Sequence, residues 1–138
     1  MKVVLDSNIY VSAFLHDRDP ERIIDLGRAT NFRIYSSLYI VEEVRKALHE
    51  KLDTSERFSI LAAERLRKFS KVVPIRGSSI RGPSPVDPKD GPIIKTCLAA
   101  RADFLLTGDK KLRALKVSGL EIVSPARFLL QLNSQGIA

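Results

Sequence analysis

The chain has 138 residues, a length that fits one domain of ordinary size. About 44% of the residues are hydrophobic, and the single cysteine, Cys97, excludes an intramolecular disulfide. No apolar run approaches the roughly 20 residues that span a bilayer, and the first residues lack the apolar stretch of a signal peptide. We therefore expect a soluble, cytoplasmic protein with no membrane association. The net charge of +7 favours a polyanionic partner such as nucleic acid, although a solvated basic surface gives the same charge.

The first half of the chain alternates short strand-like runs with helical segments. Residues 3–5 are apolar, rich in β-branched side chains, and directly precede helix-starting residues. The expected elements are a strand over 3–5, a helix started by Asp6-Ser7-Asn8, a helix over 20–30, a strand over 32–36 and a helix opened by Ser36 or Ser37.

The second half continues the alternation around one long loop. Residues 76–86 hold two glycines, two prolines and three serines, which is typical of a loop. The expected elements are a helix from a capping region at 53–56 to Phe69, strands over 72–75, 104–107 and 120–123, and helices begun by Asp90, Asp109 and Pro125. Apolar strands that alternate with helices predict an α/β fold with a parallel sheet covered on both faces, over one domain of residues 1–138.

Three aspartates recur where a strand or loop enters a helix. Asp6 follows an apolar strand, Asp109 follows another, and Asp90 opens a helix. Ligand sites in parallel sheets form beyond the carboxyl ends of the strands, so Asp6 and Asp109 are expected at one edge. Converging carboxylates repel one another and either take up protons or bind a cation. Oxygen ligands alone select Mg²⁺ or Mn²⁺, which suits phosphodiester hydrolysis.

Each acid also has a purely structural interpretation. Asp90 and Asp109 stand where aspartate commonly caps a helix, whereas Asp6 ends a strand that should be buried. Glu43 borders the apolar stripe of its helix, while Glu42 points toward solvent. Glu43 is therefore the better candidate to face the sheet edge.

The order of these acids resembles that of the PIN-domain nucleases, which are named for their similarity to the PilT N-terminus. The resemblance runs from residue 2 to about residue 128. The matching segments are Val-Val-Leu-Asp6-Ser-Asn8-Ile-Tyr-Val-Ser-Ala, Ser-Leu-Tyr-Ile-Val-Glu-Glu43-Val-Arg-Lys-Ala-Leu, Asp87-Pro-Lys-Asp90 and Ala-Asp-Phe-Leu-Leu-Thr107-Gly-Asp109-Lys-Lys-Leu.

The resemblance implies a three-layer α/β/α fold, with a mostly parallel sheet of four or five strands, and cleavage of RNA with Mg²⁺ or Mn²⁺. It carries over Asp6, Glu43, Asp90 and Asp109 as the metal-binding, catalytic acids. Asn8 and Thr107 are implied as polar neighbours that position them. The segments look most like PIN proteins that are toxins of toxin–antitoxin pairs, which would imply a homodimer and an antitoxin that blocks the site.

One departure from the family pattern is Gly91-Pro92, directly after Asp90. The proline could shift the helix start and leave either Asp87 or Asp90 as the ligand; the spacing to Ile93 favours Asp90. Basic residues flank the acids and are candidates for contact with phosphate, or form a solvated face. They are Lys110, Lys111 and Arg113 after Asp109, and Arg76 and Arg81 on the long loop.

Two other functional classes remain open from the sequence. A PIN-like module could bind RNA or nucleotide without cutting it, although the complete acid set argues against this. A receiver-like signalling domain needs paired acids near its start, where this chain has the single Asp6. DNA as the substrate is not excluded. We expect a metal-dependent endoribonuclease.

Overall fold

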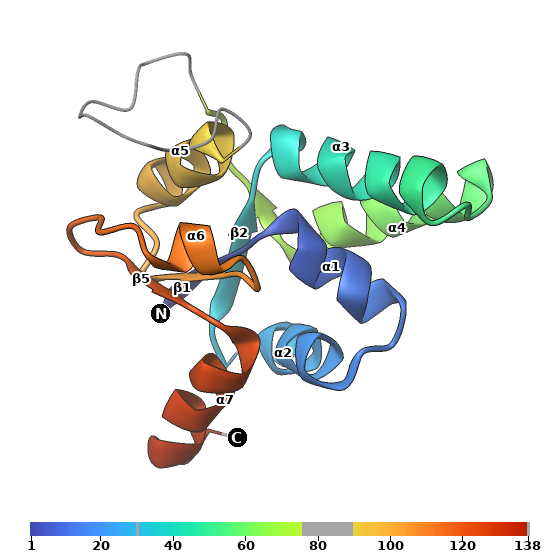
Figure 1. The fold of residues 1–138 in the computed structure, drawn as a ribbon. Coiled ribbons are helices and arrows are strands. Elements are labelled where there is room, and N and C mark those ends of the chain that lie inside the picture. The colour runs from blue at the N-terminus through green and yellow to red at the C-terminus, as the bar shows by residue number, and fades with distance from the viewer. Residues whose placement is uncertain (30, 76–89, 138) are drawn as a thin grey trace.

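The computed structural model describes residues 1–29, 31–75 and 90–137. A five-stranded parallel sheet in the order β3-β2-β1-β4-β5 forms its centre (Figure 1). The strands are β1 (Lys2–Leu5), β2 (Arg33–Ser36), β3 (Lys71–Val72), β4 (Phe104–Leu106) and β5 (Glu121–Val123). The expected parallel sheet is confirmed, with five strands.

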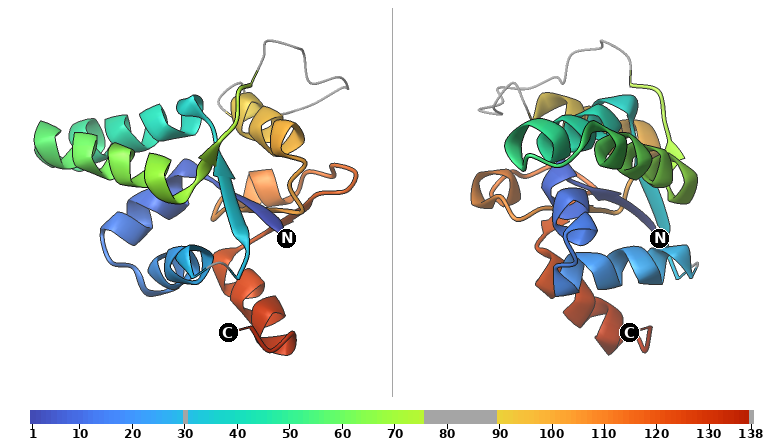
Figure 2. Two further views of the ribbon diagram at one scale, coloured as in Figure 1. Left: turned by 180° about the vertical axis from the view of Figure 1, so that it is seen from behind. Right: turned by 90° about the vertical axis from the view of Figure 1, so that its right-hand side faces the viewer.

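Helices cover the two faces of this sheet and complete a three-layer α/β/α fold. Figure 2 shows α3 and α4 as an arm on one side of β2, with α1 beside them, and α5 on the other side. The helices are α1 (Ser7–Phe14), α2 (Arg18–Arg28), α3 (Leu38–Lys46), α4 (Glu56–Phe69), α5 (Gly91–Ala100), α6 (Lys110–Arg113) and α7 (Pro125–Ser134). Among the described residues, no helix combines the length and the apolar composition of a membrane-spanning segment.

The central strand β1 determines where the first acid lies. Val3, Val4 and Leu5 are fully buried between β2 and β4, as expected for a parallel strand covered on both faces. Asp6 follows at once, and its N–H donates to the Leu106 carbonyl at 2.9 Å. The pairing of β1 with β2 and β4 therefore places Asp6 at the carboxyl edge of the sheet.

Helix α2 begins at Arg18, two residues before the expected helix over 20–30. Two further local features differ from the sequence-based expectation. The strand expected over 72–75 is only two residues long, because Pro74 lacks the N–H that would extend the ladder. Helix α3 continues into a π-helical turn over Ala47–Lys51, which hydrophobic periodicity does not reveal. Neither difference moves the carboxyl edge where the acids are expected.

Candidate functional site

Asp6 is a buried carboxylate at the carboxyl end of β1. Only 5% of the residue is exposed. The Thr107 hydroxyl donates to its Oδ2 at 2.7 Å, and the Ser7 hydroxyl contacts its Oδ1 at 3.4 Å. Burial raises the pKa of Asp6, the nearby charge of Asp109 raises it slightly further, and these hydrogen bonds oppose the rise. Asp6 also makes no side-chain cap to α1, so capping does not explain its position.

Glu43 is half-buried on α3 and lies near enough to Asp6 for the charge of Asp6 to affect it. Burial raises the pKa of Glu43, and the Asp6 charge raises it further, while hydrogen bonds from Tyr39 and Ser7 lower it. Its Oε1 is buried and meets no hydrogen-bond partner among the described residues. An unpartnered buried acceptor is costly and calls for an explanation such as an unseen ion or water. The two carboxylates therefore share this edge, and the charge of Asp6 raises the pKa of Glu43.

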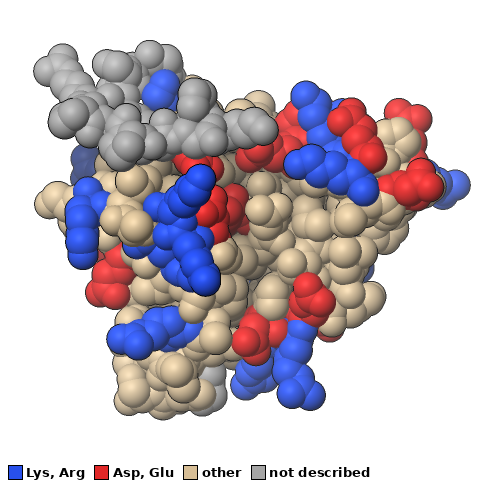
Figure 3. Space-filling model, in the orientation of Figure 1, with Lys and Arg blue, Asp and Glu red and all other residues tan. Residues whose placement is uncertain are grey.

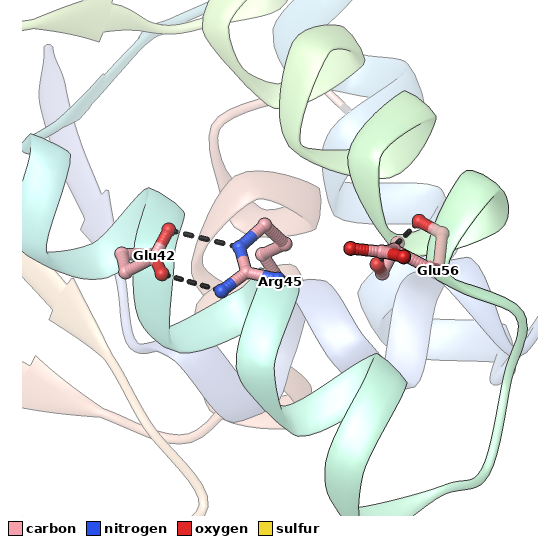
Figure 4. Close-up of polar contacts among 4 residues, drawn as sticks. Glu42, Arg45 and Glu56 are labelled. Atoms are coloured by element: carbon pink, nitrogen blue, oxygen red, sulfur yellow. Dashed lines mark hydrogen bonds and ion pairs between the residues drawn. The ribbon is translucent and has the colours of Figure 1, made fainter.

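Glu42, the neighbouring acid, belongs to the solvent side of the same helix. It is exposed, and the Arg45 guanidinium donates to its two oxygens at 2.6 and 3.0 Å (Figure 4). Glu42 and Arg45 are one turn apart on the surface of α3, and the hydrogen bonds from Arg45 lower the pKa of Glu42. The structure thus distinguishes Glu42 and Glu43 as the helical periodicity predicted.

Asp109 reaches the same edge from the turn after β4. Its N–H donates to the Thr107 Oγ1 at 3.1 Å, and its Oδ1 accepts from the Lys111 N–H at 2.8 Å, so the carboxylate also caps α6. The capping interpretation is confirmed for Asp109. It does not exclude a second role, because one carboxylate has several acceptor positions and the side chain is exposed.

Asp90 lies near enough to Tyr39, a neighbour of Glu43 on α3, for its charge to affect the tyrosine. It stands at the start of α5 without capping the helix through its side chain, so the capping interpretation fails there. Burial raises the pKa of Tyr39, and the charges of Glu43, Asp90 and Asp6 raise it further. Sequence reasoning missed Tyr39 as a site residue; the available signal was its position one turn before Glu43 on the same helix.

The oxygen donors of the four acids suit a hard cation such as Mg²⁺ or Mn²⁺. Their arrangement, however, is not that of a preformed metal-coordination site. All four acids offer oxygen, and Asp6 lies close enough to Glu43 for its charge to raise the pKa of Glu43. Within the described ranges, however, no group of three or more acidic, histidine or cysteine side chains is placed to hold a metal ion.

The remaining predicted residues fall into three groups. Asn8 is exposed on α1, and Thr107 is fully buried against Asp6. Lys110 and Lys111 are exposed on α6, and Figure 3 shows Lys and Arg beside an acidic hollow in this part of the surface. Arg113 is half-buried, and its Nη1 donates to the Thr107 carbonyl at 3.1 Å. Outside the described residues lie Asp87, Arg76 and Arg81.

Comparison with known proteins decides the family. A family model of the PIN domain matches residues 2–111, which span β1 to α6 and include all four acids. The chain belongs to the PIN domain family. Proteins with PIN domains are typically nucleases that depend on divalent metal ions. The resemblance seen in the sequence is thereby confirmed.

Among solved structures, this PIN domain is similar to the crystal structure of VapBC2 from Rickettsia felis bound to a DNA fragment from their promoter. The TM-score is 0.66 at 15% identity, with 88% of this chain and 97% of the matched chain covered. At that identity the likeness concerns the fold. A search of curated proteins finds no match.

Proposed function

We propose that this PIN domain is a divalent-metal-dependent endoribonuclease and the toxin component of a toxin–antitoxin pair. The observation that carries the proposal is the buried Asp6 carboxylate facing Glu43, whose Oε1 has no hydrogen-bond partner among the described residues, at the edge where Asp109 also lies. In this proposal Asp6, Glu43, Asp90 and Asp109 hold Mg²⁺ or Mn²⁺.

In this proposal the residues around the acids have different roles, according to where they lie. Thr107 holds the Asp6 carboxylate in place, and Glu43 presents a free oxygen that can accept a proton from the attacking water. The bound ion would make water more acidic and stabilise the charge developing on the phosphoryl oxygens. Lys110 and Lys111, exposed beside Asp109, would attract the RNA backbone.

The antitoxin part of the proposal draws on the family resemblance. Separately from the acids, a groove at the opposite edge of the sheet offers a further surface that a protein partner could contact. The groove has a volume of about 1150 Å³ and lies between the ends of α1 and α4, α2 and the start of β2. Apolar residues including Ile24, Phe32 and Ile34 line it. Its charged lining is mostly basic, with Arg28, Arg33, Arg65, Lys68 and Lys71 against Glu21 and Asp25. An acidic partner with apolar anchors would complement this surface. A homodimer in the cytoplasm remains part of the same prediction.

Cleavage of labelled single-stranded RNA in Mg²⁺, Mn²⁺ or EDTA tests the enzymatic claim. We expect the wild type to cut only with metal, and Asp6→Asn to lose at least about 100-fold, since even residues that merely orient metal ligands are worth roughly 10–100-fold. Glu42→Gln is the matched control and should cut like the wild type.

The alternative is a PIN module that binds RNA or nucleotide without cutting, which the absence of a ready metal cage in the described residues favours. RNA binding without any metal-dependent cleavage would establish that alternative and overturn the nuclease proposal. Cleavage of single-stranded DNA in preference to RNA would correct the substrate.

A further inference from the structure

Thr107 connects three segments of the candidate site. Its N–H donates to the Val123 carbonyl at 3.0 Å and so ties the end of β4 to β5. Its hydroxyl donates to Asp6 at 2.7 Å and accepts from the Asp109 N–H at 3.1 Å. The Thr107 side chain therefore contacts both aspartates and helps to fix their relative position.

The turn that follows Thr107 has little packing support. Gly108 is exposed, and a Cβ built on it would meet no atom within 4 Å. Asp109 is exposed as well. Leu112 anchors α6 in the core, but the turn between Thr107 and α6 is itself exposed, so hydrogen bonds help to hold the direction in which Asp109 leaves the sheet.

Arg113 supplies such a hydrogen bond from the far end of α6. Its Nη1 donates to the Thr107 carbonyl at 3.1 Å, while its own N–H donates to the Asp109 carbonyl at 3.0 Å. The side chain is half-buried, whereas Lys110 and Lys111 on the same helix are exposed. Arg113 thus closes a ring of contacts around the turn, and the other two cations face solvent.

We propose that Arg113 is a positioning residue that fixes the Thr107–Asp109 turn and thereby the approach of Asp109 to Asp6. The proposal rests on the proposed metal-dependent function, and it assigns Arg113 a role apart from contact with phosphate. A planar guanidinium on a short helix presents a donor at a fixed angle, which a flexible ammonium does not reproduce. Residues that orient metal ligands in this way commonly change metal affinity roughly 10–100-fold when replaced.

The test uses Arg113→Met and Arg113→Lys, with Arg22→Met on the exposed side of α2 as a matched loss of one guanidinium. Mn²⁺ affinity is measured by calorimetry on RNA-free protein, and amide hydrogen exchange is measured on metal-free protein. We expect both Arg113 variants to bind Mn²⁺ about 10-fold more weakly and to exchange the Asp109 amide faster. Arg22→Met should match the wild type in both measurements.

Each other result has a definite meaning. Wild-type Mn²⁺ affinity and exchange in Arg113→Met, with only weaker RNA binding that depends on salt, would overturn the proposal and make Arg113 a phosphate contact. A wild type that binds no Mn²⁺ would overturn the proposed function itself and the metal-directed part of this inference. The exchange measurement would still decide whether Arg113 holds the turn.

Discussion

At the scale of single residues, the site holds carboxylates whose ionised form is unfavourable in the folded protein. Asp6 and Glu43 bring two carboxylates into a partly desolvated place, where burial raises both pKa values. The charge of Asp6 raises the pKa of Glu43 further, and the charge of Asp109 raises that of Asp6. Such groups destabilise the folded chain when ionised, and a cation relieves them. Strain of this kind is typical of functional sites rather than of structural ion pairs.

Asp6→Asn should therefore stabilise the metal-free protein at neutral pH. The folded state holds the Asp6 proton more tightly than the unfolded state, so the free energy of unfolding falls as the pH rises from near 3.8 through the raised folded pKa. Thermal unfolding in EDTA should show the variant melting above the wild type at pH 7 and close to it at pH 3.5. A variant that melts below the wild type at pH 7 would mean that the hydrogen bonds to the carboxylate outweigh its burial.

At the scale of elements, local sequence signals predict helix starts well and contacts between elements poorly. Helix α4 runs from Glu56 to Phe69 as expected, because the Ser55 hydroxyl accepts from the Phe58 N–H at 3.1 Å. The sequence also predicted that Asp6 and Asp109 share an edge, since this follows from strand direction alone. It could not predict the contact of Arg113 with the Thr107 carbonyl or the clustering of Asp90 with Tyr39, because both depend on how separate elements pack.

Two serine helix caps, one near the acids and one away from them, allow an effect on stability to be distinguished from an effect on the site. Ser37 caps α3, which carries Glu43, and its Oγ lies 2.8 Å from the Thr96 Oγ1 on α5; Ser55 caps α4 away from the acids. Ser37→Ala and Ser55→Ala should each lower the free energy of unfolding by about 1 kcal/mol in urea titrations. Only Ser37→Ala should also weaken Mn²⁺ binding. Equal Mn²⁺ affinity in the two variants would show that the α3–α5 contact does not support the site.

At the scale of the whole molecule, one core fixes the sheet and leaves its two edges free for different roles. The strands and the helices around them share a continuous buried cluster that includes Cys97 on α5. The acids gather at the carboxyl edge, and the basic groove opens at the other. The basic residues behind the net charge of +7 therefore lie in two places. Some lie beside the acids, and others line the groove at the opposite edge of the sheet.

Cys97 reports on the integrity of this core. Burial raises the pKa of its thiol to about 12, so almost no thiolate is present at pH 8 in the folded protein. A thiol reagent at pH 8 should label the native chain far more slowly than the chain in denaturant. Rapid labelling of the native protein would show that α5 opens readily, and the position of Asp90 at its start would then be in doubt.

Calorimetric titration of Mn²⁺ into the RNA-free protein tests whether the separate carboxylates form one metal-holding pocket. We expect the wild type and Glu42→Gln to bind alike, whereas Asp6→Asn and Glu43→Gln should each lose at least about 10-fold in affinity. Equal affinity for Glu42→Gln and Glu43→Gln, or no saturable binding to the wild type, would contradict this expectation.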